Sequence, residues 1–147
     1  MNEEKAKKSF PCYRNAAGKV IFDHSKLPAN AKQQDIEEVY RVCKKGKIDA
    51  EAFLSSYEEG LHNKDMDLDD PSTFSTSCFE KLRDAKLLCK CIKKWNPSPV
   101  IAKGHIVYDS GFSLRDKDKA IPKKGSHVDW WIFDGEHPEN YFEEWSE

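Results

Sequence analysis

The chain has 147 residues, of which 34% are charged and 38% hydrophobic, and its formal net charge is −2 at pH 7. Four Trp, eight Phe and five Tyr supply large apolar side chains for a core, which excludes disorder throughout the chain. No apolar run approaches the roughly 18 residues that span a bilayer, and the first twenty residues lack the apolar core of a signal peptide. We therefore expect a cytoplasmic protein that does not enter the membrane.

The first half of the chain is predicted to be mainly helical, after a frayed N-terminus at residues 1–9. Residues 10–13 and 19–22 flank a turn-forming loop and predict a small β-hairpin. Apolar residues at helical spacing predict a helix over 30–44, and an N-cap aspartate predicts a second over 49–60. Together these two helices would form an αα-hairpin.

The second half predicts one longer helix and a small sheet. Ser77 and Glu80 fit the two reciprocal roles of a capping box, so we expect a helix over 78–94 that ends before two prolines. Residues 100–108 and 126–133 read as strands, and 113–126 as a long polar loop. The expected fold is one α+β domain over 10–147, with a helix packed on a mostly antiparallel sheet.

Charge is strongly segregated along the chain, which bears on what it binds. Residues 81–124 hold twelve basic residues against four acids, whereas 134–147 hold six acids and no Lys or Arg. Fields of one sign concentrate ligands of the other sign. The candidate binding residues are the cations and aromatic residues of the basic helix and the segments beyond it: Lys86, Lys90, Lys93, Lys94, Trp95, Lys103, Lys123, Lys124, Trp130 and Trp131.

The same features have plainer explanations. The lysines could be a solvated helix face, or could pair with the acidic end of the chain itself. Adjacent strand residues face opposite sides of a sheet, so either Trp130 or Trp131 needs cover from the following segment or from a partner. Lysine supplies 20 of the 24 cations, a bias that is common in bacteria and phages with AT-rich genomes.

Two histidines are the first candidates for catalysis. His105 and His127 are each placed at the start of an apolar strand, and period-two alternation places Asp129 on the same face as His127. Paired histidines serve as general base and general acid in metal-independent ribonucleases, and a nearby carboxylate can orient an imidazole. His127 is the stronger of the two because only it has a same-face carboxylate.

A thiol is the second catalytic candidate. Cys78 would lie in the first turn of the predicted helix, where the helix dipole favours a thiolate. The chain order of Cys78, a histidine and Asp129 also matches papain-like cysteine hydrolases. Against this, the five cysteines are scattered and odd in number, which favours reduced and buried thiols.

No Gly-rich phosphate loop or complete metal-binding loop is present, so we expect no cofactor and no metal. The function predicted first is a non-enzymatic binding or adaptor domain that engages an acidic protein through the basic helix and the aromatic strand. A nucleic acid is the second possible partner, although an overall acidic chain argues against tight non-specific binding. The alternative function is a small hydrolase that uses the paired histidines, or less favourably Cys78.

Overall fold

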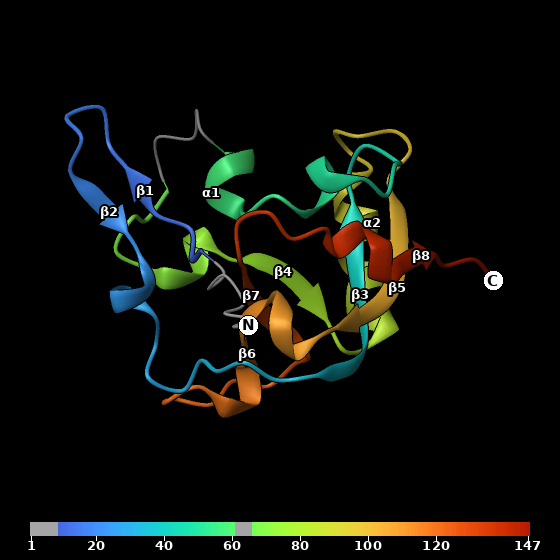
Figure 1. The fold of residues 1–147 in the computed structure, drawn as a ribbon. Helices are drawn as coiled ribbons and strands as arrows, with labels where there is room; N and C mark the ends of the chain where they lie inside the picture. Colours follow the sequence, from blue (N-terminus) through green and yellow to red (C-terminus); the bar gives the residue numbers. More distant parts are fainter. Residues whose placement is uncertain (1–8, 61–65) are drawn as a thin grey trace, which may run out of the picture.

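A computed structural model describes residues 9–60 and 66–147, and its main feature is a six-stranded antiparallel sheet (Figure 1). The strand order is β6-β7-β4-β3-β5-β8. These strands are β3 (Ile36–Cys43), β4 (Thr76–Phe79), β5 (Val100–Ile106), β6 (Gly111–Arg115), β7 (His127–Ile132) and β8 (Phe142–Glu144). The predicted frayed terminus, 1–9, lies outside the described residues except for Ser9.

The remaining elements are short. The strands β1 (Tyr13–Arg14) and β2 (Val20–Phe22) form the predicted hairpin, which is confirmed, and the two α-helices of the described residues are α1 (Ser56–Glu59) and α2 (Leu82–Ile92). Single 3-10 turns join the strands: η1 (His24–Lys26), η2 (Ala50–Phe53), η3 (Pro71–Phe74), η4 (Tyr108–Ser110), η5 (Asp116–Asp118) and η6 (Pro138–Tyr141).

The predicted helical N-terminal half is wrong, because residues 36–43 form the long central strand β3. This strand is covered on both faces, with Val39 and Cys43 in one core cluster and Tyr40 and Val42 in another. A strand buried on both faces carries apolar residues at consecutive positions. Such a run can match helical spacing by coincidence, and its β-branched and aromatic residues are the better guide.

The helices predicted over 49–60 and 78–94 also begin at later residues than expected. Residues 49–60 form η2 and the four-residue helix α1, and the capping box there belongs to Ser55 and Glu58. Ser77 lies within β4, opposite Asp129 of β7, and α2 begins only at Leu82 without a side-chain cap. The predicted capping box at Ser77 is therefore wrong, because pairing with a distant strand outweighs a local sequence signal.

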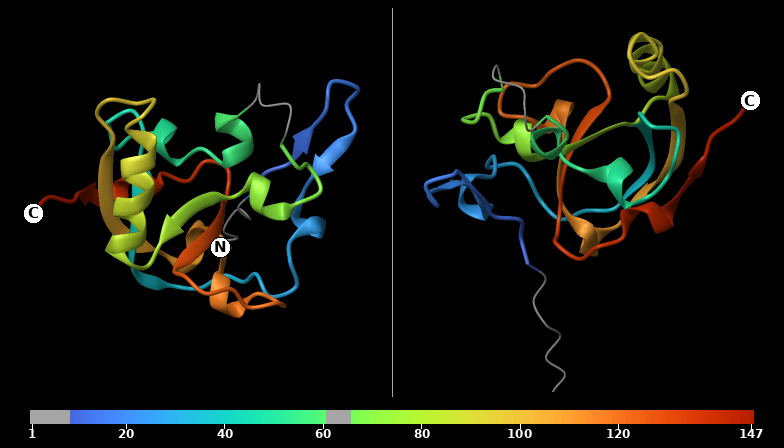
Figure 2. Two further views of the ribbon diagram at one scale, coloured as in Figure 1. Left: turned by 180° about the vertical axis from the view of Figure 1, so that it is seen from behind. Right: turned by 90° about the horizontal axis from the view of Figure 1, so that it is seen from above.

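Both faces of the sheet are covered, as the view from above shows (Figure 2). The inner face carries Val128 and Trp130 of β7 together with residues of β3, β4 and β5. On the outer face, α2 packs over Tyr40, Val42 and Ile101. The β1–β2 hairpin and η3 cover the other end of that face, where Trp131 and Leu114 lie. The helix α2 and the hairpin thus lie over opposite ends of the same face of the sheet.

Candidate functional site

A groove of about 550 Å³ runs between α2 and the segment that contains β8. One wall is α2, the floor is the start of β5, and the other wall is Trp145. Its lining residues are Lys86, Cys89, Lys90, Lys93, Pro99, Val100, Ile101, Glu144 and Trp145. Three of the predicted binding lysines are therefore brought together at one concave surface.

The helix α2 places these lysines in a row because of their spacing. Lys86, Lys90 and Lys93 stand at positions i, i+4 and i+7, which share one face of an α-helix. The adjacent apolar stripe of Ala85, Cys89 and Ile92 is buried against the sheet and fixes the rotation of the helix. The lysines consequently border the groove on the side that faces solvent.

The far wall of the groove is held by residues 145–147, which follow β8. The backbone N–H of Trp145 donates to the carbonyl of Ile101 at 2.8 Å, which extends the pairing of β8 with β5. Lys86 Nζ lies 4.9 Å from the centre of the Trp145 ring, a cation–π contact. The same ammonium group lies 3.3 Å from Glu147 Oε1. An aromatic ring and a carboxylate thus already contact the basic wall.

The charge of the groove is unbalanced. Lys90 and Lys93 are exposed, and neither has an ion-pair partner within residues 9–60 and 66–147. Glu144 is the single acid in the lining, against three lysines. A partly enclosed surface with an apolar floor strengthens such a field relative to open water. The groove is therefore suited to a ligand that is both acidic and partly apolar.

The other predicted cations lie outside this groove. Lys94 and Trp95 follow α2 and are exposed, with Trp95 77% accessible. Lys103 pairs with Glu38 at 3.8 Å, and Lys123 and Lys124 are exposed on the loop before β7. The predicted binding set thus divides into a groove group and scattered surface residues.

The aromatic strand β7 is buried and does not form a binding surface. This corrects the prediction that Trp130 and Trp131 are binding residues. Both indoles are buried, at 0% and 1% exposure. The Trp130 Nε1–H donates to Ser110 Oγ, and the Trp131 Nε1–H donates to the carbonyl of Pro71. Each face of β7 has its own cover, so neither side chain is left for a partner.

A second hollow, of about 570 Å³, lies beside the loop after β3. Its three lysines face four acids, and two of the lysines are paired, Lys44 with Glu59 and Lys45 with Glu51. Its charges therefore balance one another. Unlike the groove along α2, this hollow therefore has no excess of positive charge that would attract an anionic ligand.

A polar cluster surrounds His127 on the outer face of β7. Its Nε2 lies 2.9 Å from Ser77 Oγ, and its Nδ1 lies 3.4 Å from Asp116 Oδ1. Lys119 bridges this carboxylate and Asp129, with Nζ–oxygen distances of 2.9 and 3.2 Å. The predicted proximity of His127 and Asp129 is present as a 3.8 Å contact between Nε2 and Oδ1.

Asp129 acts as the buried centre of this cluster. It is 1% exposed and accepts hydrogen bonds from Ser72 and Ser75 as well as the Lys119 contact. Burial by itself would lower the pKa of Lys119, but the hydrogen bonds and charges of the two aspartates outweigh it and raise that pKa. The arrangement joins the 72–75 and 116–119 segments to β7.

Sequence reasoning missed three members of this cluster as site residues. Ser77 lies on β4, while Asp116 and Lys119 lie on or just after η5. They meet His127 only through the pairing of β4 and β6 with β7. No local spacing connects them, so the sequence alone offers no signal for the cluster.

His105 and His127 are not brought together. His127 lies opposite Phe79 of β4, and His105 belongs to β5, which is three strands away from β7. Three steps from strand to strand separate the two histidines by about 14 Å in the direction perpendicular to the strands. His105 is exposed and packs against the Tyr141 ring, with 5.3 Å between ring centres. A general acid and general base acting across one bond require a much closer pair.

Cys78 lies on β4 rather than in the first turn of a helix, so the predicted dipole effect does not apply. Its side chain is fully buried, and burial raises the pKa of the thiol to about 12. At neutral pH the sulfur is therefore protonated and shielded from substrates. This environment does not favour the cysteine-hydrolase hypothesis.

Comparison of the chain with protein-family models, with curated protein sequences and with solved structures found no significant match. Within the described residues, no group of three or more His, Cys, Asp or Glu side chains is placed to hold a metal ion. None of the helices in those residues has the length and apolar character needed to cross a membrane.

Proposed function

We propose that this protein is a binding module that captures an acidic segment of a protein partner in the groove along α2. The observation that carries the proposal is the contact already made inside the groove. Lys86 holds the Glu147 carboxylate at 3.3 Å and the Trp145 ring at 4.9 Å. A partner segment with an acid and an aromatic residue would satisfy Lys90 and Lys93 in the same way.

An acidic peptide fits this groove better than a nucleic acid does. The floor of Val100 and Ile101 offers apolar contact to side chains, which a phosphate backbone cannot use. The lining offers three lysines against Glu144, a short row of positive charge that matches a few carboxylates better than a continuous row of phosphates.

Charge reversal tests this proposal. The probe is a fluorescein-labelled peptide with the sequence of residues 143–147 and capped ends, followed by fluorescence anisotropy. We expect the triple variant Lys86→Glu, Lys90→Glu and Lys93→Glu to bind at least about tenfold more weakly than the parent chain, because the groove then repels the probe.

The control variant carries the same change in net charge outside the groove, as Lys117→Glu, Lys123→Glu and Lys124→Glu. These three lysines are exposed and should leave the affinity within about twofold of the parent value. An equal loss in both variants would show that total charge, and not the groove, governs binding. A thymidine oligonucleotide of the same net charge that binds more tightly than the peptide would overturn the choice of partner.

A hydrolase is the second candidate function, and one observation favours it. The Ser77–His127–Asp116 contacts, at 2.9 and 3.4 Å, have the connectivity of a serine-hydrolase relay. In such a reaction Ser77 Oγ would attack an ester carbonyl and pass its proton to His127 Nε2, which would return it to the leaving alkoxide. Water would then release the acyl group. The binding proposal ranks first because neither hollow described above borders Ser77.

An active-site probe decides this second candidate. A fluorophosphonate ester should label the parent chain at Ser77, and Ser77→Ala should lose the label while the exposed control Ser98→Ala keeps it. Peptide mapping of the labelled chain identifies the modified residue. If Ser77 stays unmodified under conditions that label a known serine hydrolase, the relay is structural and the hydrolase candidate is rejected.

A further inference from the structure

The segment that forms the far wall of the groove is firmly fixed at its beginning. Phe142 is buried at the edge of the core, with ring centres 4.9 Å from Phe53 and 6.1 Å from Trp130. Gly104 on β5 makes room for it, because a Cβ atom there would collide with the Phe142 ring and the Tyr141 carbonyl. Phe142 is therefore an anchor that keeps β8 on the sheet.

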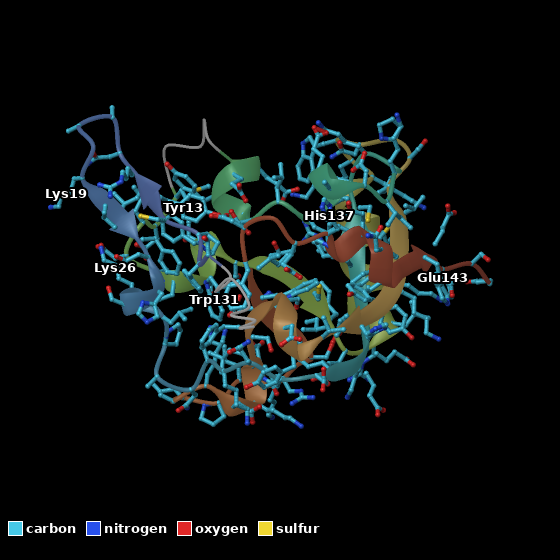
Figure 3. All side chains as sticks on the ribbon, viewed as in Figure 1. Tyr13, Lys19, Lys26, Trp131, His137 and Glu143 are labelled. Atoms are coloured by element: carbon cyan, nitrogen blue, oxygen red, sulfur yellow. The ribbon has the colours of Figure 1, made fainter. Side chains whose placement is uncertain are left out.

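The end of the segment is held much more loosely. Glu147 and Lys86 are 79% and 47% exposed, and exposed ion pairs are weak and screened by salt. Trp145 packs only partly buried against the edge of the α2 cluster, and its backbone makes one hydrogen bond to Ile101. Residues 145–147 can therefore leave the groove while Phe142 remains in place. Figure 3 shows β8, marked by Glu143, far from Lys19 in the β1–β2 loop and from Lys26 in η1.

Departure of these residues would expose an edge of β5. The register pairs β8 with β5 at Ala102, Lys103 and Gly104, and the bond from Trp145 to Ile101 continues that pairing by one step. Val100 lies next along β5 and lines the groove. An unpaired strand edge accepts an extended chain through backbone hydrogen bonds.

We propose that residues 145–147 form a displaceable wall of the groove, and that an extended acidic segment with an aromatic residue binds by displacing them from the edge of β5. This inference rests on the proposed function and names both its ligand and its regulation. The displaced residues supply the pattern for the ligand, since Trp145 and Glu147 make the two contacts to Lys86. Residues 145–147 then compete with the partner, and the apparent affinity falls in proportion to the fraction of time for which the edge of β5 is free.

Weakening the contacts of residues 145–147 with Lys86 tests the inference. The variant Trp145→Ala with Glu147→Gln removes both contacts to Lys86, and Glu143→Gln is the matched control, because Glu143 is exposed and does not line the groove. The probe is the labelled, capped peptide of residues 143–147, measured by anisotropy. If residues 145–147 cover the edge of β5 for about nine-tenths of the time, the variant should bind about tenfold more tightly than the parent, and the control should match the parent.

Each other result has a distinct meaning. Equal affinity of parent and variant would overturn displacement and leave the proposed function standing. Weaker binding by the variant would show that Trp145 contacts the peptide instead of competing with it, which also overturns displacement. Absence of binding to the parent and to both variants would contradict the proposed function itself. Thermal unfolding of each variant verifies that the sheet is intact before binding is compared.

Discussion

Replacing Arg41 with methionine is expected to lower the free energy of unfolding by about 3–5 kcal/mol. Arg41 lies on β3 and is 5% exposed. Its Nε donates to the Ala52 carbonyl and its Nη1 to the Ser77 carbonyl, both at 2.9 Å. Methionine retains the aliphatic stem but removes the guanidinium donors from these two part-buried carbonyl oxygens. Urea unfolding followed by tryptophan fluorescence measures the loss.

Lys44→Met is the control for this variant. Lys44 and Arg41 contact the same Glu59 oxygen, at 3.4 and 3.6 Å, but the Lys44 side chain is 42% exposed. Exposed pairs contribute about 0–1 kcal/mol, so Lys44→Met should cost little. If both variants lost the same small amount, the buried guanidinium would not hold the 50–54 segment as we describe.

The Asp129→Ala variant is expected to lose about 3 kcal/mol of stability. Its carboxylate is the buried acceptor for Ser72, Ser75 and Lys119. Alanine would leave the Ser72 hydroxyl without this acceptor, and would leave Ser75 with only the Ser72 carbonyl and Lys119 with only Asp116. The matched control is Asp118→Ala, whose side chain is 41% exposed and lies 4.0 Å from Arg115. Losses of similar size in the two variants would contradict a central role for Asp129.

The pH dependence of this cluster has a defined sign. The folded-state pKa of Lys119 is raised above its usual value of 10.5. Its stabilising contribution is therefore complete below that pH and is lost as the pH rises through the folded-state value. Asp129→Ala should make the loss of stability above pH 10.5 less steep than in the parent chain.

Part of the fold could be predicted because it depends on local pattern. The β1–β2 hairpin follows from its turn residues, and strands β5 and β7 follow from β-branched and aromatic runs. The strand β3 could not be separated from a helix, because cover on both faces produced apolar residues at helical spacing. What decides its conformation is pairing with β4 and β5, which are distant in sequence.

In the candidate sites, too, the sequence predicted the features that lie within one element and missed the contacts between distant segments. The row of Lys86, Lys90 and Lys93 is a property of one helix, so the sequence predicted it. The opposite wall at Trp145 depends on β8 pairing with β5, which lies about 40 residues earlier in the chain, and no spacing rule reveals this pairing. Likewise the alternation of β7 predicted His127 beside Asp129, but not Asp116 and Lys119, which arrive from another segment.

The central claim is that the groove along α2 binds an acidic segment, and nuclear magnetic resonance tests it most directly. A chain labelled with nitrogen-15 is titrated with the capped peptide of residues 143–147. We predict that the largest shift changes occur at the backbone amides of Cys89, Lys90 and Val100 and at the Trp145 indole, which line the groove. Largest changes in the 117–124 loop, or none at any amide, would contradict the account.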